Sequence, residues 1–253
     1  PGEGMLLGLD GKAVGMNEMP FLPPTAHFSV SPDGERMIYF KYLSSVGTAS
    51  AAVRDMVANT DVFAWPIGAD ASRSCEFVGW SEDGRKAYCL ARGASRTDVK
   101  SYDVRSFAHA LVASAADARD AEYSIRHSLL VSAAGNRVSL YDAEAKARRD
   151  LVRMPEGTAV ENVLLAPDAS RVFFTAGGSV YSAEVENGTP TLLVPDARLV
   201  SLSSDGKLML FERGDAEGGM RFSVAYADGS RAKDLYVTTK DVVHTRYVGW
   251  FSN

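Results

Sequence analysis

The residues of this sequence that could do chemistry are its histidines and its scattered carboxylates. The four histidines, His27, His109, His127 and His244, stand far apart, and none lies in a His-Glu-x-x-His or similar metal-ligand spacing. The nucleophile elbow Gly-x-Ser-x-Gly, the Walker loop and the dinucleotide fingerprint are also absent from the sequence. We therefore expect no catalytic residue, no bound metal and no cofactor.

Asp-Gly pairs recur along the chain and could suggest calcium loops. They begin at Asp10, Asp33, Asp83, Asp205 and Asp228. The further spaced carboxylates of a calcium loop are missing. Because strand-like apolar runs flank the pairs, we expect hairpin turns.

The elements that position these turns form an internal repeat. Each copy is an apolar run, a turn resembling Ser-Pro-Asp-Gly and a second apolar run, in Phe28–Phe40, Val78–Leu90, Leu164–Phe174 and Leu202–Phe211. The turn aspartates at 33, 83, 168 and 205 are 50, 85 and 37 residues apart, so a degenerate copy is expected in Tyr123–Val131. Ser, Pro and Asp favour a type I turn, and a left-handed Gly would close a three-residue hairpin loop. In one copy Ala169 replaces this Gly.

A third and a fourth strand follow each hairpin. Third strands are expected at Asp61–Ile67, Val99–Asp103, Arg137–Asp142, Ser179–Ala183 and Phe222–Gly229, and fourth strands at Thr191–Val194 and Lys233–Val237. Four short antiparallel strands in a repeat of this length are typical of β-propeller blades. The sequence therefore predicts an all-β fold, a single propeller domain of about six blades over residues 1–253.

The two ends of the chain complement each other. Tyr247–Asn253 repeats Phe77–Asp83, whereas Met5–Gly11 and Ala13–Met16 resemble a third and a fourth strand. We expect these N- and C-terminal strands to share the sixth blade and close the ring. The expected blades are approximately 26–75, 76–120, 121–156, 157–196 and 197–240, with the sixth formed by 241–253 and 4–20.

The Ser-Pro-Asp-Gly turns between apolar strands resemble the repeat of TolB-like propellers. This resemblance implies a bacterial envelope protein, periplasmic or extracellular, that binds other proteins as a scaffold and carries a lipid anchor or a fused segment at its N-terminus. The repeat also occurs in propeller domains of peptidases and of carbohydrate-active enzymes. The alternatives are therefore the propeller domain of a larger hydrolase or peptidase, and a glycan-acting enzyme with its site at the channel mouth.

Composition narrows the range of partners. The net charge is −5 and no Lys/Arg run exceeds two residues, so nucleic acid is not an expected partner. No apolar stretch approaches the ~20 residues of a membrane span. Because the chain starts with Pro1, we expect a processed or trimmed chain whose leader is already removed.

Two segments are candidate binding elements. Ser44–Thr60 is interpreted as an insertion with a helix, whose apolar face of Val53, Met56 and Val57 either binds a partner or caps its own blade. Polar residues at the starts of first strands converge on the channel mouth, namely His27, Glu76, Tyr123, Asn162 and His244. A polar, water-filled channel is the favoured interpretation there, and a small-molecule or peptide-terminus site is the alternative.

The two cysteines are candidates for a disulfide. If Glu82–Gly84 is a three-residue loop, Cys89 lies opposite Phe77 and Cys75 lies diagonally on the same face. Such a diagonal is about 7 Å, near the limit for a disulfide. A four-residue loop would instead place the thiols on opposite faces. A Cys75–Cys89 bond would imply an oxidising compartment.

Overall fold

The computed structural model describes residues 3–7, 13–18, 28–43, 48–58, 60–66, 75–93, 95–106, 108–118, 120–214 and 218–237. These residues form strands and turns without a helix, so the chain is all-β over its described part. None of them belongs to a helix long and apolar enough to cross a membrane.

Five four-stranded antiparallel sheets follow one another along the chain, each with its strands in sequence order. Sheet B contains β3 (Phe28–Val30), β4 (Arg36–Leu43), β5 (Thr48–Asp55) and β6 (Thr60–Pro66). Sheet C contains β7 (Cys75–Trp80), β8 (Lys86–Arg92), β9 (Arg96–Asp103) and β10 (His109–Ala116). Sheet D contains β11 (Asp120–Ser124), β12 (Leu129–Ala134), β13 (Arg137–Asp142) and β14 (Ala147–Arg153). Sheet E contains β15 (Val160–Leu165), β16 (Arg171–Ala176), β17 (Ser179–Glu184) and β18 (Pro190–Val194). Sheet F contains β19 (Arg198–Leu202), β20 (Leu208–Gly214), β21 (Met220–Tyr226) and β22 (Lys233–Val237).

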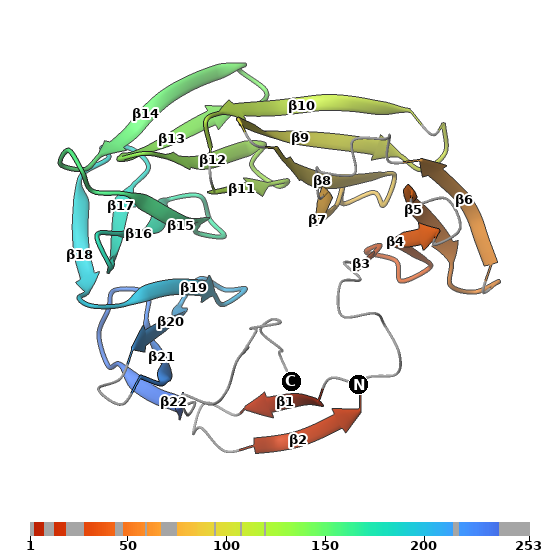
Figure 1. Cartoon of the computed structure of the whole chain (residues 1–253). Helices are drawn as coiled ribbons and strands as arrows, with labels where there is room; N and C mark the ends of the chain where they lie inside the picture. The colour runs from red at the N-terminus through yellow and green to blue at the C-terminus, as the bar shows by residue number, and fades with distance from the viewer. Residues whose placement is uncertain are drawn as a thin grey trace.

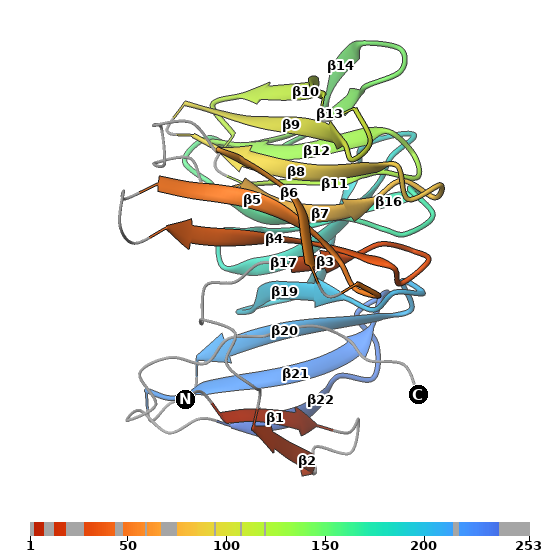
Figure 2. The same cartoon turned by 90° about the vertical axis from the view of Figure 1, so that its right-hand side faces the viewer.

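The five sheets stand around a central axis (Figures 1 and 2). The first strand of each sheet lies innermost and the fourth lies at the periphery (Figure 1). A two-stranded sheet A, of β1 (Glu3–Leu7) and β2 (Ala13–Glu18), lies in the arc between sheets F and B. The expected closing strand in 241–253 lies outside the described residues, as do His27 and His244.

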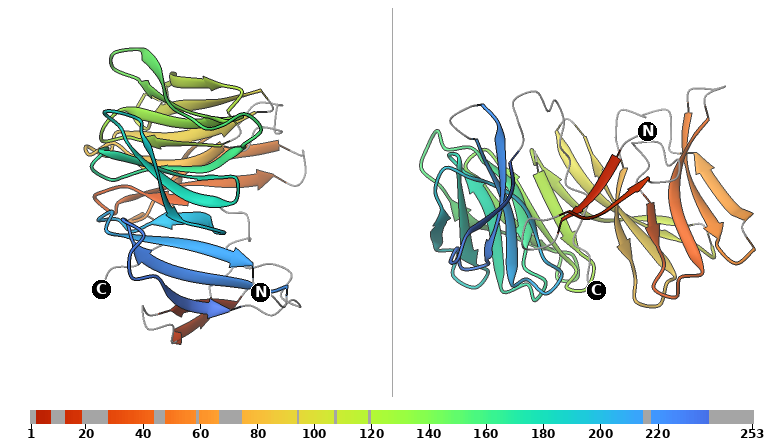
Figure 3. Two further views of the ribbon diagram at one scale, coloured as in Figure 1. Left: turned by 90° about the vertical axis from the view of Figure 1, so that its left-hand side faces the viewer. Right: turned by 90° about the horizontal axis from the view of Figure 1, so that it is seen from below.

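The hydrophobic core is divided among the interfaces between consecutive sheets. One cluster joins sheets D and E through residues such as Val131 and Phe174, and another joins E and F through Phe173 and Phe211. Sheets C, D and E therefore pack on both faces, and Figure 3 shows consecutive sheets lying face to face. This explains why their strands read as near-continuous apolar runs and not as an alternating pattern.

The turn between the first and second strands repeats in detail. In sheet B the main-chain N–H of Ser31 donates to Arg36 O at 2.8 Å, and Asp33 Oδ1 accepts from Ser31 Oγ at 2.5 Å and from Glu35 N at 3.0 Å. Gly34 is left-handed, with φ of 73°. The predicted Gly conformation is therefore present, but the three-residue loop was wrong. Four residues separate Ser31 from Arg36, because this pair closes the hairpin.

The predicted helical insertion is also wrong. Thr48–Asp55 is the third strand of sheet B, and it pairs with β4 and with β6. Asp55 ends this strand by accepting from the main-chain N–H groups of Val57 and Ala58, as Asp103 and Asp142 do at the ends of β9 and β13. Pairing on both edges thus prevails over the helix propensity of an alanine-rich segment. The segment Asp61–Ile67, expected as the third strand, overlaps β6, which is the fourth strand of the sheet.

Candidate binding site in the central channel

A cavity of about 460 Å³ lies among the innermost strands. Its lining residues come from four neighbouring sheets and are Val78, Leu90, Arg92, Asp120, Ala121, Glu122, Tyr123, Asn162, Val163, Leu164 and Val200. Hydrophobic walls with a few converging polar groups are typical of a binding pocket.

Bulges in the innermost strands shape this cavity. The pairing register shifts around Val78 in β7, around Asn162 and Val163 in β15, and around Val200 in β19. All four residues line the cavity. A bulge adds one residue to a strand and redirects the side chains beside it, which is why bulges are frequent next to functional sites.

Asn162 is the most unusual residue of the cavity. Its φ is +53°, a left-handed conformation that few non-glycine residues adopt. Its Oδ1 atom is buried and has no hydrogen-bond partner, as is the case for only two other side-chain atoms of the described residues, Trp80 Nε1 and Arg213 Nε. Buried polar atoms are normally hydrogen-bonded, so an unpaired amide oxygen in the wall of the cavity marks a place where a donor is missing.

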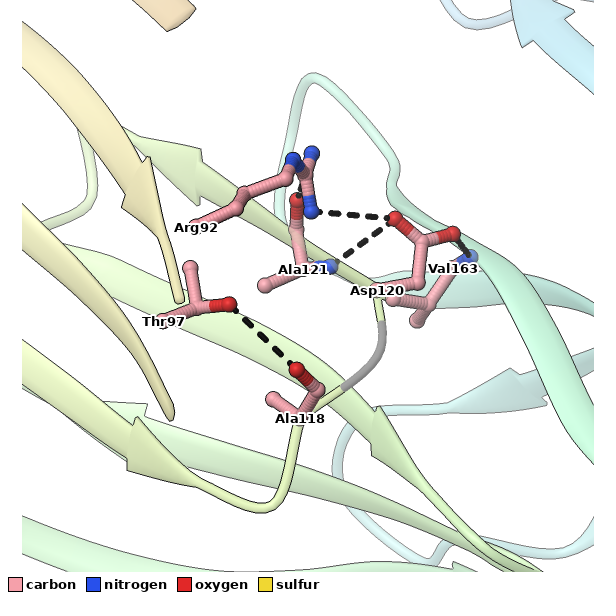
Figure 4. Close-up of polar contacts among 6 residues, drawn as sticks. All are labelled: Arg92, Thr97, Ala118, Asp120, Ala121 and Val163. Carbon is pink, nitrogen blue, oxygen red and sulfur yellow. Dashed lines mark hydrogen bonds and ion pairs between the residues drawn. The ribbon is translucent and has the colours of Figure 1, made fainter. Parts of the chain in front are cut away.

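Arg92 and Asp120 join three sheets beside the cavity (Figure 4). The Arg92 guanidinium, at the end of β8, lies 3.3 Å from Asp120 Oδ1 and donates to Ala121 O at 3.0 Å. Asp120 Oδ2 accepts from the main-chain N–H of Val163 at 3.1 Å. Asp120 therefore connects sheet C, its own sheet D and sheet E.

Glu122 makes a similar contact two residues further along β11. One of its carboxylate oxygens accepts a hydrogen bond from the main-chain N–H of Leu165. The two carboxylates thus satisfy N–H groups on the unpaired inner edge of β15. Together with Asn162, they give the cavity more acceptors than donors, and its lining carries two carboxylates to one guanidinium. This composition favours a ligand rich in hydrogen-bond donors.

The structure brings two of the five predicted mouth residues to this cavity, Tyr123 and Asn162. The Tyr123 ring packs against Tyr88, with centroids 5.8 Å apart, and burial raises the pKa of its hydroxyl. His27, His244 and the side chain of Glu76 lie outside the described part of the chain.

Sequence reasoning missed Arg92, Asp120 and Glu122. Asp120 and Glu122 are two residues apart, the spacing that puts two side chains on one face of a strand. This pattern could have predicted the pair of carboxylates from the sequence. Arg92 gave no local signal, because it meets Asp120 only through the packing of two sheets.

The other predicted binding residues lie away from this cavity. Val53 is 1 % exposed and packs with Ile38 and Trp80 in the core between sheets B and C, so it offers no binding surface. Met56 and Val57 follow β5 in a turn and are 43 % and 83 % exposed. They lie beside the Ser31–Arg36 turn, where the main-chain N–H of Met56 donates to Glu35 O. This turn follows the last residue of the innermost strand β3, whereas the predicted mouth residues lie at the starts of the innermost strands.

Cys89 is fully buried in β8. The side chain of Cys75, the other cysteine of the sequence, lies outside the described residues, so the Cys75–Cys89 pairing stays a prediction. Within the described ranges, no three His, Cys, Asp or Glu side chains are grouped so that they could hold a metal ion.

Comparison with solved structures identifies the architecture. TolB from Acinetobacter baumannii is 16 % identical, with a TM-score of 0.55 over 86 % of this chain and 54 % of its own. An oligogalacturonate lyase in complex with manganese is 16 % identical, with a TM-score of 0.63 over 87 % of this chain and 66 % of its own. The β-propeller domain of the trilobed protease from Pyrococcus furiosus is 11 % identical, with a TM-score of 0.52 over 85 % of this chain and 72 % of its own.

The chain has a β-propeller fold. No protein-family model matches the sequence, and no curated protein matches it either. At these identities the likeness shows the fold alone. The propeller spans about half to two thirds of the length of the TolB and lyase structures.

Proposed function

We propose that this chain is a non-catalytic, protein-binding propeller of the bacterial cell envelope, which holds a segment of its partner in the channel cavity. The observation that carries the proposal is Asn162, because a strained backbone and a buried, unpaired amide oxygen meet there at a bulge. Strain of this kind persists where the surroundings enforce it, and it is concentrated at ligand sites. Peptide N–H groups and ammonium groups are the donors that such an acceptor would bind.

The engagement of the cavity carboxylates supports a binding role over a catalytic one. Asp120 and Glu122 accept main-chain hydrogen bonds from β15, and Asp120 is also paired with Arg92. A carboxylate that acts as a general base must be within hydrogen-bond reach of the proton it removes, and contacts to main-chain N–H groups compete for its oxygens. These two groups instead hold neighbouring blades together.

The alternative is the propeller domain of a larger hydrolase or peptidase, or a glycan-acting enzyme with its site at the channel mouth. The similar structures support this alternative, because they include the oligogalacturonate lyase, a prolyl endopeptidase and a dipeptidyl peptidase. The propeller covers 35 % and 37 % of the two peptidase chains. A catalytic domain encoded next to these residues in the full-length gene would favour this alternative.

The envelope location rests on the resemblance to TolB-like repeats and on the cysteines. TolB proteins from two bacteria are among the structures with this fold. A Cys75–Cys89 bond would persist in an oxidising compartment such as the periplasm. A lipid anchor or a fused N-terminal segment would hold the propeller there.

We also propose that the propeller has a sixth blade. Sheet A lies in the arc between sheets F and B, and two further strands would complete it as a four-stranded blade (Figure 1). Tyr247–Trp250, which repeats Phe77–Trp80, is the proposed innermost strand. The Pyrococcus protease propeller has an open velcro topology, so closure of the ring is not required by the fold.

A cross-linking capture experiment tests the function. Tagged wild-type propeller should retain a discrete protein from a bacterial envelope extract. Asn162→Gly keeps the left-handed backbone but removes the amide, and it should lose this protein. Asn187→Gly is the matched control, because Asn187 lies in the exposed turn after β17. Equal capture by all three proteins, or turnover of a peptide or glycan substrate by the wild type, would contradict the proposal.

A further inference from the structure

Three blades share a polar clamp between their third and fourth strands. In sheet F, Ser223 Oγ donates to Asp234 at 2.7 Å, and the Arg221 guanidinium lies 2.7 Å from the same carboxylate. The corresponding sets are Ser139, Asp150 and Arg137 in sheet D, and Ser114, Asp98 and Arg96 in sheet C. In each set the arginine precedes the third-strand member by two residues. The clamp thus fastens the fourth strand with an arginine of the third strand, and in sheet D Arg153 of the fourth strand also pairs with Asp150.

Sheet F places a second arginine beside this clamp on its second strand. Arg213, at the end of β20, lies directly opposite Arg221 in the ladder. The position opposite Arg137 in sheet D is Ala134, and Gly93 hydrogen-bonds to Arg96 at this place in sheet C. Two blades therefore build the clamp with a small residue where sheet F has a second cation, although like charges facing each other across strands are destabilising.

The Arg213 guanidinium makes no ion pair and no hydrogen bond with the described residues. Its central carbon lies 5.0 Å from the centre of the Phe211 ring, a cation–π contact that orients the plane of the group. Its Nε atom is buried and has no hydrogen-bond partner. Asp234 is the nearby carboxylate; Ser223 and Arg221 hydrogen-bond to it, and the charge of Arg213 adds to their lowering of the pKa of Asp234. Arg213 therefore keeps donors for another acceptor.

Arg213 lines a second cavity, of about 380 Å³, between sheets E and F. Glu161 of this cavity and Asn162 of the channel cavity are consecutive residues of β15, so the two cavities are neighbours. Met220, 36 % exposed, gives the second cavity an apolar contact. Asp196 and Glu161 line it on the sheet E side.

We propose that this second cavity binds the carboxylate of a peptide C-terminus through Arg213. Guanidinium groups bind carboxylates with two parallel hydrogen bonds, and here the terminal Nη atoms would make them, because Nε is buried. Arg198 and Glu212, which also line the cavity, pair with each other. Asp196 and Glu161 would repel a dianion such as phosphate about twice as strongly as a singly charged carboxylate, and they can accept from the N–H group next to a terminal carboxylate. The proposal rests on the proposed function only for the source of the carboxylate, a protein partner.

Nuclear magnetic resonance tests the site on the intact chain. Titration with N-acetyl-leucine should shift the Arg213 Nε–H resonance in the wild type, whereas N-acetyl-leucinamide, which lacks the carboxylate, should leave it unmoved. Arg213→Gln should weaken binding about tenfold or more. Arg126→Gln removes the same charge from an exposed turn in sheet D and should bind as the wild type does. The wild-type resonance keeps the test valid if Arg213→Gln fails to fold.

Three outcomes would overturn the inference. They are an unmoved Nε–H resonance, equal binding of the amide, and equal weakening by both arginine variants. Acetate or inorganic phosphate binding as tightly as N-acetyl-leucine would refute the assignment to a peptide terminus. Asn162→Gly separates the two proposals, because it should abolish partner capture and leave the N-acetyl-leucine titration unchanged.

Discussion

Pro167 packs against Gly206 in the turn of the next blade. A Cβ atom built on Gly206 would lie 2.8 Å from Pro167 Cδ, closer than side chains tolerate. In the same way, a Cβ on Gly84 would lie 3.8 Å from Pro32 Cδ. The Pro of one Ser-Pro-Asp-Gly turn therefore lies next to the Gly of the corresponding turn in the following blade.

The imperfect copies of the turn follow the same relationship. Glu82 replaces the proline in sheet C, and Ser128 replaces the glycine in the turn of sheet D. Likewise, Arg126 replaces the proline in sheet D, and Ala169 replaces the glycine in sheet E. Ser128 and Ala169 are both left-handed, with φ of 53° and 57°. At Gly206 glycine is needed for space behind the proline, whereas a Cβ on Gly84 would make only an ordinary contact. Where no proline precedes, Ser128 and Ala169 take the position at the cost of backbone strain.

Gly206→Ala is expected to destabilise the propeller more than Gly34→Ala does. Both residues are left-handed, with φ of 69° and 73°, so both substitutions should lose about 1 kcal/mol from backbone strain. Only at Gly206 does the new methyl group meet a neighbour, and overpacking adds about 1–3 kcal/mol. Nothing lies within 4 Å of a Cβ on Gly34. Chemical unfolding measures both variants, and equal losses would show that the contact with Pro167 has no effect.

Val53→Ala and Val57→Ala separate the strand from the predicted helix. Val53 is 1 % exposed and Val57 is 83 % exposed, although the chemical change is the same. Losing two buried methyl groups and leaving a cavity should lower the free energy of unfolding by about 2 kcal/mol at Val53. Val57→Ala should change it by less than about 0.5 kcal/mol. An amphipathic helix with both residues on its buried face would give similar losses.

The fold class could be predicted from the sequence because the repeat carries its own turn chemistry. The degenerate copy shows this: β11 and β12 pair around Ile125–Ser128 as the spacing predicts, without a Gly or an Asp in the turn. The third strand of sheet B was missed because alanines at 49, 51, 52 and 58 favour a helix in isolation. Asp55, which occupies the position of Asp103 and Asp142, was the available signal.

The channel cavity was predictable only in part. Tyr123 and Asn162 were found because the starts of first strands converge on the channel in a propeller. The bulges were not predictable, because they depend on how an inner strand fits its two neighbours and leave no fixed residue type in the sequence. The place of Arg213 beside the clamp is visible only when the ladders of three sheets are compared.

Acid should destabilise the propeller through its turn aspartates. Ser hydroxyl and main-chain N–H donors lower the pKa of Asp33, Asp83 and Asp205 from the usual 3.8. The unfolded chain therefore takes up protons at a higher pH than the folded chain does. The stabilisation is fully present above the unfolded pKa and is lost as pH falls through the lowered folded values.

The midpoint of urea unfolding, followed from about pH 5 to about pH 3, measures this loss. Asp83→Asn should make the midpoint less sensitive to acid, because an amide does not titrate. Glu156→Gln is the control, since Glu156 is exposed and makes no side-chain hydrogen bond to the described residues. A parallel pH profile for wild type and Asp83→Asn would contradict the prediction.

The last prediction concerns Cys75 and Cys89. Phe77 pairs with Cys89 and Cys75 pairs with Ala91, so the two cysteines are diagonal neighbours on one face, as the sequence predicted. The reason differs from the predicted one. Ser81 closes a four-residue loop with Lys86, and the bulge at Val78 then shifts the register back by one residue.

A Cys75–Cys89 bond would close a loop of about 15 residues and stabilise the fold by about 3 kcal/mol through the unfolded chain. We expect no reactive thiol in the denatured, unreduced protein. Reduction should lower the free energy of unfolding of the wild type, whereas the Cys75→Ser/Cys89→Ser variant should not respond to the reductant. Two reactive thiols per chain would disprove the bond and remove the support that the cysteines give to an envelope location.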